Sequence, residues 1–118
     1  MTHYILVINT GSTSTKFALY ADREVLLEEK IAHSAGDLKP YPHIGDQLEF
    51  RVSLAEDFAA RAMKLHAFDT IVALGGMLPP VRSGCYEINE AMCSFLYNTK
   101  QEHASNLEIG RASCRERV

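Results

Sequence analysis

The sequence predicts an α/β fold built on a mixed β-sheet. Three runs rich in apolar and β-branched residues follow one another between Tyr4 and His33, with only brief polar turns between them. A long stretch with helical periodicity comes next, and a further apolar run then ends at a glycine pair. Consecutive strands joined by tight turns form an antiparallel meander, and a helical connection to a later strand implies a crossover. We therefore expect the order β-β-β-α-β-α, with a helix on at least one face of the sheet.

The strands of the meander are expected, in order, at Tyr4–Thr10, Lys16–Ala21 and Glu24–His33. The first run is dense in β-branched residues and predicts a strand that is buried on both faces. In the third run Val25, Leu27 and Ile31 alternate loosely with polar residues. That alternation predicts a strand with one face exposed to solvent.

A loop and then a long helix are expected after the meander. Gly36, Pro40 and Pro42 predict a loop with room for a single helical turn. Asp46 and Glu49 have the spacing of a capping box. Apolar residues then recur at intervals of three and four positions, which predicts a helix over 47–66. Its buried face is expected to contain Leu48, Val52, Ala55, Ala59, Ala62 and Leu65.

Shorter elements are expected in the rest of the chain. Asp69–Leu74 predicts a strand that the following glycine pair ends. Cys85–Ile88 predicts a short strand, and Asn89 is a good N-cap for a short helix after it. Glu102–Leu107 has the pattern of the start of another helix.

Composition excludes several classes of protein. The 118 residues are 47% hydrophobic and 23% charged, as in an ordinary globular domain. The net charge is −3, so there is no basic surplus to indicate a nucleic-acid or anionic-membrane partner. The apolar run Tyr4–Ile8 is too short to span a bilayer or to serve as a secretory leader. Three cysteines do not make a disulfide framework, so we expect a cytoplasmic location.

Residues 108–118 are expected to lie outside the native protein. Back-translation of Glu108–Val118 gives a DNA sequence that resembles a widely used sequencing adapter read in frame. The alternative is a short basic amphipathic tail. We therefore expect residues 1–107 to be native and to form a truncated N-terminal domain.

The segment between the first two strands carries the chemistry, and it reads Asn9-Thr10-Gly11-Ser12-Thr13-Ser14-Thr15-Lys16. Gly11 permits a backbone conformation that other residues resist, and it permits close approach by a ligand. Backbone N–H groups and small hydroxyl side chains in such a turn can hold phosphate oxygens. Lys16 supplies a positive charge, and Asn9 offers an amide oxygen of the kind that hydrated Mg²⁺ accepts.

Local composition alone favours a simpler interpretation of this segment, a Ser/Thr-rich hairpin with a surface lysine and no ligand. The segment is not a P-loop, because the GxxxxGK[ST] pattern is absent. A second strand, and not a helix, is expected after the turn. That order also argues against a Rossmann fingerprint.

Four segments together resemble the acetate and butyrate kinases: ILVINTGSTSTKFALY, DTIVALGGMLPP, SGCYEINEAM and EHASNL. The last three resemble the butyrate kinase branch more closely. These kinases belong to a superfamily with the sugar kinases, Hsp70 and actin, so the resemblance implies a ribonuclease H-like, actin-like ATPase first domain. It also implies transfer of a phosphoryl group from ATP, with Mg²⁺, to a short-chain carboxylate such as butyrate. The products would be an acyl phosphate and ADP.

The resemblance assigns roles to residues of the first turn by position. Asn9 matches the asparagine that lies near the metal in the family, and Lys16 matches the lysine that contacts the nucleotide phosphates. Gly11, Ser12 and Ser14 match the phosphate turn. These roles suit phosphoryl transfer, which depends on positioning and on neutralising charge.

Residues nearer the C-terminus match the substrate side of the family's site. Gly75 and Gly76 match a glycine pair that lines the carboxylate pocket. Leu74 stands where butyrate kinases usually carry an arginine, and leucine cannot make the bidentate pair that arginine makes with a carboxylate. His103 matches a histidine near the substrate cleft, although a packed, hydrogen-bonded histidine is the simpler interpretation.

The resemblance further implies that the main catalytic residues lie beyond residue 118, and that the parent protein is a homo-oligomer. We therefore expect the 118-residue chain to be inactive by itself. Two alternatives stay open. One is another ATPase of the sugar kinase and Hsp70 superfamily that shares only the hairpin, and the other is a non-catalytic binding module in which the hairpin is purely structural.

Overall fold

The computed structural model describes residues 1–73, 82 and 84–98. Its elements are β1 (Tyr4–Thr10), β2 (Ser14–Ala21), β3 (Glu24–Ala32), α1 (Ala35–Leu38), η1 (Ile44–Gln47), α2 (Leu48–Leu65), β4 (Thr70–Ala73) and α3 (Glu90–Asn98). The strands form one mixed sheet in the order β3-β2-β1-β4. The pairs β1–β2 and β2–β3 are antiparallel, and β4 is parallel to β1. The predicted α/β class, the meander and the element order through α2 and β4 are confirmed.

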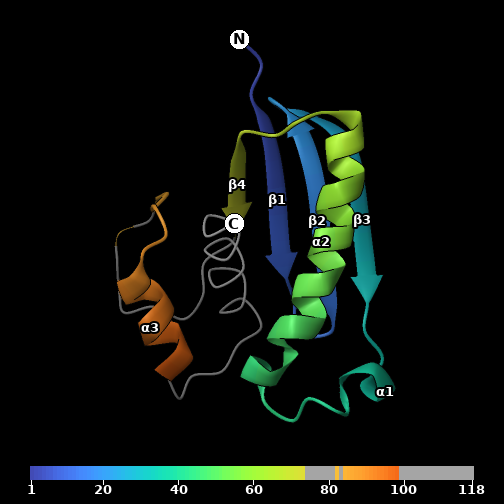
Figure 1. Ribbon diagram of the computed structural model, residues 1–118, viewed down its shortest axis with the longest axis vertical. Coiled ribbons are helices and arrows are strands. Elements are labelled where there is room, and N and C mark those ends of the chain that lie inside the picture. The colour runs from blue at the N-terminus through green and yellow to red at the C-terminus, as the bar shows by residue number, and fades with distance from the viewer. Residues whose placement is uncertain (74–81, 83, 99–118) are drawn as a thin grey trace.

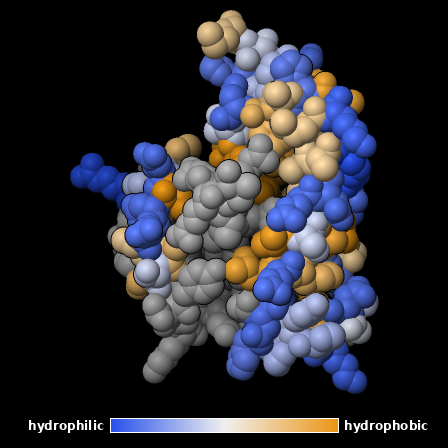
Figure 2. All heavy atoms as spheres, viewed as in Figure 1, coloured by the Kyte–Doolittle hydropathy of each residue, from blue (hydrophilic) through white to orange (hydrophobic). Residues whose placement is uncertain are grey.

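The helix α2 crosses one face of the sheet (Figure 1). It carries the chain from the β3 edge back to the opposite edge, where β4 pairs with β1. Figure 2 shows hydrophilic side chains along the outer side of the molecule where α2 lies, with hydrophobic atoms visible between them. Within the described residues, no helix combines the length and the apolar character that a membrane span requires.

The core lies between α2 and the sheet. Alternation along the strands places Leu6 and Ile8 of β1, and Phe17 and Leu19 of β2, on the face toward α2, each no more than 3% exposed. Phe58 of α2 is fully buried, and its ring stacks on that of Phe17 with centroids 5.2 Å apart. Burial of a phenylalanine side chain contributes roughly 1.5–3 kcal/mol. This layer therefore holds α2 against the meander.

The buried face of α2 differs from the predicted one. Ala55 and Ala62 are buried as expected, but Arg51 and Phe58 are buried with them. Leu65, which was expected on this face, is 57% exposed because it is the last residue of the helix, beyond the core position Ala62. The prediction missed Arg51 because it counted only apolar residues.

The start of α2 also differs from the prediction. Gln47 is the N-cap and makes no side-chain cap, whereas Asp46 Oδ2 accepts from the His43 N–H at 3.3 Å within the preceding turn. The predicted capping box at Asp46 is therefore wrong. A capping box instead opens α1, where Ser34 Oγ accepts from Asp37 N–H at 3.1 Å and Asp37 Oδ2 accepts from Ser34 N–H at 2.9 Å.

Two strand predictions need correction. β1 is not buried on both faces, since only the residues on its α2 side are buried and the others are half-buried. On β3, Leu27 and Ile31 are half-buried as expected, but Val25 is 45% exposed. A register shift opposite Leu19 and Tyr20 changes the alternation of side chains at that end of the strand.

The last part of the described chain is partly as predicted. Asn89 caps α3, and its Oδ1 accepts from the Met92 N–H at 2.9 Å, which confirms the predicted helix start. The predicted strand at Cys85–Ile88 is wrong, because that segment has no regular secondary structure and pairs with no strand of the described sheet. The helix predicted from Glu102 lies outside the described residues.

Candidate functional site

The turn between β1 and β2 is closed by its own backbone. The Gly11 N–H donates to the Ser14 carbonyl at 2.8 Å. Gly11 does not have a positive φ, so the expectation of an unusual backbone conformation is wrong. A Cβ at this position would lie 3.2 Å from Ser14 Oγ. The glycine is therefore explained by this close approach within the turn.

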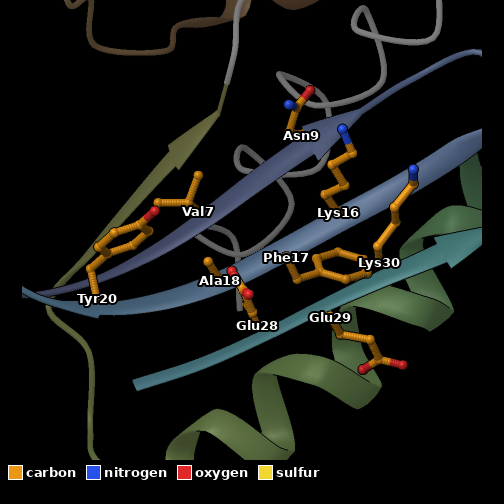
Figure 3. A pocket seen from close by; sticks show the side chains of 9 residues that line it. All are labelled: Val7, Asn9, Lys16, Phe17, Ala18, Tyr20, Glu28, Glu29 and Lys30. Carbon is orange, nitrogen blue, oxygen red and sulfur yellow. The ribbon is translucent and has the colours of Figure 1, made fainter. Parts of the chain in front are cut away.

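Three polar side chains lie in one row across three strands. Asn9 of β1 is directly opposite Lys16 of β2, and Lys16 is directly opposite Lys30 of β3. Residues paired in this way share a face of the sheet. Figure 3 shows the three side chains extending toward the same side. This is the face away from α2, because the next residue along β2, Phe17, packs in the core.

An open pocket of about 450 Å³ lies on this face (Figure 3). The polar row forms one part of its lining, and Val7, Ala18 and Tyr20 form a less polar part. Small-molecule sites typically occupy about 300–1,000 Å³ and combine apolar lining with a few polar groups. The structure thus brings Asn9 and Lys16 together beside a concave surface.

The row contains two adjacent positive charges. Across the residues that the structure describes, neither Lys16 nor Lys30 forms an ion pair. Glu28 and Glu29 also line the pocket, but the Glu29 side chain extends to the other side of the sheet (Figure 3). Glu29 pairs there with Arg61. Like charges placed directly opposite each other destabilise a sheet, and an anionic ligand between them removes that cost. The arrangement is suited to a polyanion such as a polyphosphate.

A buried arginine holds the turn from the α2 side. Arg51 is only 2% exposed. Its Nη1 donates to the carbonyl oxygens of Gly11 at 2.9 Å and Ser14 at 3.2 Å, and its Nη2 donates to that of Ser12 at 3.2 Å. Its Nε donates to Gln47 Oε1 at 2.9 Å, one helical turn earlier. One guanidinium group therefore binds three carbonyl oxygens of the turn.

These contacts determine where the N–H groups of the turn point. In a planar trans peptide the N–H of one residue points opposite to the C=O of the residue before it. The described chain has no cis peptide bond. Because the carbonyls of Gly11 and Ser12 point at Arg51, the N–H groups of Ser12 and Thr13 point away from it. Among the described hydrogen bonds, neither N–H has an acceptor. Two successive N–H groups directed outward can bind an anion.

A second buried contact connects the turn region to β3. Thr15 Oγ1 accepts from Arg51 Nη1 at 3.1 Å and lies 2.8 Å from His33 Nε2. Which of these two atoms donates depends on the tautomer of the His33 ring. Burial lowers the pKa of His33, and the charge of Arg51 lowers it further, against a smaller opposing effect of Asp37. A pKa below the ordinary value of 6.5 favours the neutral form of His33 at pH 7.

Sequence reasoning missed two residues of this region, Arg51 and Lys30. Arg51 lies four residues after Gln47 and four before Ala55, so helical spacing places it on the buried face. A charged residue at such a position was the signal that could have identified it. Lys30 gave no comparable signal, because its place beside Lys16 depends on the register of β2 and β3.

The predicted substrate-side residues lie outside the described part of the chain. These are Gly75, Gly76 and His103, together with Leu74. Within the described residues, no group of three or more His, Cys, Asp or Glu side chains could hold a metal ion. Asn9 supplies one amide oxygen, which fits Mg²⁺ because that ion usually keeps several waters and binds substrate phosphates.

Comparison with known proteins supports one family. No family model matches the chain. The chain is 41% identical over 104 residues to a probable butyrate kinase of Bacteroides thetaiotaomicron, in a match that covers 87% of this chain and 29% of that protein. It is 40% identical over 105 residues to probable butyrate kinase 1 of Thermotoga maritima, and the match covers 87% of this chain and 29% of that protein. It is 37% identical over 105 residues to butyrate kinase 1 of Clostridium acetobutylicum, and the match covers 87% of this chain and 30% of that protein.

The chain therefore spans about 30% of the length of the curated relatives it matches. Several relatives named as probable butyrate kinases each match 87% of this chain. The four-stranded mixed sheet agrees with the first domain that the sequence resemblance implied. The chain belongs to the butyrate kinase family.

Proposed function

We propose that the β1–β2 hairpin binds the terminal phosphates of ATP, in a protein that transfers the γ-phosphoryl group to a short-chain carboxylate such as butyrate. The observation that carries the proposal is the pairing of Asn9 with Lys16 beside a pocket on the open face of the sheet. The names of the relatives support the same activity.

Each group of the hairpin has a part in this proposal. The ammonium group of Lys16 binds phosphate oxygens, and that of Lys30 adds a second positive charge beside it. The outward N–H groups of Ser12 and Thr13 donate to phosphate oxygens. Asn9 would offer its amide oxygen to Mg²⁺ or to one of its waters. Bound Mg²⁺ supplies neutralisation of charge on the phosphates.

In the proposed reaction a carboxylate oxygen attacks the γ-phosphorus. The bond between that phosphorus and the β–γ bridging oxygen breaks, and the products are an acyl phosphate and ADP. No proton has to be transferred, because the nucleophile is already an anion. The hairpin therefore contributes through positioning and electrostatic stabilisation.

The substrate side of the proposal rests on the sequence resemblance. Gly75 and Gly76 are proposed to line the carboxylate pocket, with His103 near it. The 118-residue chain is proposed to bind nucleotide without turning it over, because the matched relatives are more than three times longer than the matched segment.

The proposal is tested in a chimaera, in which residues 4–107 replace the matching segment of the Clostridium acetobutylicum relative. Acyl phosphate formed from ATP and butyrate is measured as the hydroxamate. We expect Lys16→Ala to lower kcat/KM about 10²–10³-fold, as expected for loss of a group that stabilises charge in the transition state. Lys64→Ala, an exposed lysine in the last turn of α2, is the control and should leave kcat/KM unchanged.

The acceptor distinguishes the proposal from its alternatives. A folded chimaera that phosphorylates a sugar, or releases ADP without any acceptor, would indicate another branch of the superfamily. Unchanged activity of Lys16→Ala would indicate that the hairpin does not bind phosphate, as in a purely structural role.

A further inference from the structure

We propose that Arg51 is a positioning residue for nucleotide binding, which acts by holding the carbonyl oxygens of the β1–β2 turn so that its N–H groups point at the phosphates. This inference rests on the proposed function of the hairpin. It adds to that function a residue on another element, 37–40 positions away in sequence from the turn residues whose carbonyls it binds.

The single side chain of Arg51 reaches three carbonyls of the turn. A hydroxyl side chain has one donor and an amide has two, whereas the planar guanidinium has five and reaches the carbonyls of Gly11, Ser12 and Ser14 together. Two of these contacts fix the peptide planes that carry the Ser12 and Thr13 N–H groups. The orientation of both donors is therefore set before any ligand arrives.

The guanidinium is itself held rigidly. It is buried, Gln47 accepts from its Nε, and Thr15 Oγ1 accepts from its Nη1 at 3.1 Å. Thr15 is in turn within hydrogen-bond distance of His33, which the ring of Phe50 contacts edge-on. Arg51 thus connects the turn to both α2 and β3.

The contacts also act on the donors electronically. A carbonyl that accepts from a positive guanidinium polarises its peptide group, which makes the N–H on the other side of that peptide a stronger donor. The positive charge of Arg51, which lies on the far side of the turn, also attracts the negative charge of the proposed phosphates. Both effects favour an anion at the Ser12 and Thr13 N–H groups.

The test uses Arg51→Lys, which keeps the charge but loses the fork that reaches three carbonyls. In the chimaera we expect KM for ATP to rise about tenfold to a hundredfold, with KM for butyrate unchanged. Arg61→Lys is the matched control, because Arg61 lies on the same helix but pairs with Glu29 at the surface. It should leave both constants unchanged.

A second readout does not depend on turnover. In the ¹⁵N-labelled 118-residue chain, magnesium-ATP should shift the Ser12 and Thr13 amide resonances in a saturable way. Arg51→Lys should weaken this binding by at least about tenfold while the circular dichroism spectrum is retained. If Arg51→Lys does not fold, Gln47→Met removes the acceptor for Arg51 Nε and should shift the same resonances and KM in the same direction.

Three outcomes separate the claims. Wild-type KM for ATP and wild-type amide shifts in folded Arg51→Lys and Gln47→Met would overturn the inference about Arg51. Equal increases in both KM values would also overturn it, since they would indicate a general structural role. Wild-type binding by Lys16→Ala would instead overturn the proposed function, whatever the Arg51 variant does.

Discussion

The two hairpin turns of the meander are held in different ways. The β2–β3 turn is held by the segment that precedes β1, where Asp22 N–H donates to the His3 carbonyl and Asp22 Oδ1 accepts from the His3 N–H, both at 2.8 Å. The β1–β2 turn is held from α2, through the contacts of Arg51 with its carbonyls. Asp22 of the β2–β3 turn therefore supplies one donor and one acceptor to His3, whereas the β1–β2 turn leaves the N–H groups of Ser12 and Thr13 unused within the described chain.

This difference shows how a turn can be both rigid and available to a ligand. A turn that satisfies its own donors has none left for binding. In the β1–β2 turn, the Gly11 N–H bonds within the turn and Arg51 binds the carbonyls, so the Ser12 and Thr13 N–H groups stay available to a ligand. Binding there costs little further backbone entropy, because the backbone was already fixed on folding. The following variants test the comparison, in order of decreasing effect.

The largest effect is expected for Arg51→Met. The substitution keeps an unbranched side chain but removes every donor that Arg51 offers. The buried acceptors Gln47 Oε1 and Thr15 Oγ1 lose this partner, as do the part-buried carbonyls of the turn. Each buried polar group left without a partner costs about 1–3 kcal/mol, and we expect a loss of at least about 3 kcal/mol in the free energy of unfolding. Urea denaturation checks this value. A loss below about 1 kcal/mol would contradict the view that α2 holds the turn.

A pH effect is expected next, from His33. Its pKa is lowered in the folded state from 6.5, mainly by burial and then by Arg51. The unfolded state therefore binds the proton more readily, so this stability is fully present above pH 6.5 and is lost as the pH falls through the lowered pKa. The slope for one such group is at most about 1.4 kcal/mol per pH unit.

Urea denaturation at pH 8, 7, 6 and 5 measures this slope, and His33→Gln should remove it. The pKa of Asp37 is also lowered, from 3.8, through hydrogen bonds from Ser34, so its contribution is lost only at lower pH. An unchanged slope in His33→Gln would show that another group causes it.

A smaller effect is expected for Gly11→Ala. The added Cβ would lie 3.2 Å from Ser14 Oγ and 3.4 Å from the Ser14 carbonyl, so the turn has to adjust. We expect a loss of about 1 kcal/mol, typical of mild overpacking. Adding Ser14→Ala removes the closer contact and should recover part of the loss. If the double variant is no more stable than Gly11→Ala, the steric explanation is wrong.

The smallest effect is expected at the β2–β3 turn, from Asp22→Gly. Asp22 has a φ of 53°, a region that glycine adopts without strain. The relief of this strain offsets the loss of one exposed hydrogen bond to His3, and we expect a net change within about 0.5 kcal/mol. Nucleotide binding should be unchanged. A change in binding as large as that of Arg51→Lys would show that the two turns are not independent.

The sequence was informative where a local pattern determines the structure. The runs at β1 and β4, the periodicity of α2 and the cap at Asn89 all follow from neighbouring residues, and each element was predicted to within about two residues. The sequence assigned Asn9 and Lys16 to one phosphate-binding hairpin, and the register of β1 and β2 places them directly opposite each other.

Other features depend on contacts that no local pattern contains. The position of Lys30 depends on the register of β3, and that of Val25 depends on the register shift beside it. The role of Arg51 depends on α2 lying across the turn, which the packing of its buried residues, Phe58 among them, against the sheet brings about. The physical reason is the same in each case, since tertiary placement determines which side chain meets which backbone group.

The direction of β4 has a consequence for the proposed reaction. β4 runs parallel to β1, and their pairing ends with Ala73 beside Ile8, one residue before Asn9. In α/β sheets, ligands bind outside the carboxyl ends of parallel strands. The described part of β4 therefore ends at the same end of the sheet as the turn where the proposed donor phosphates bind. In the proposed reaction, the shared direction of β1 and β4 would place the phosphate-binding turn and the start of the proposed acceptor segment at one end of the sheet.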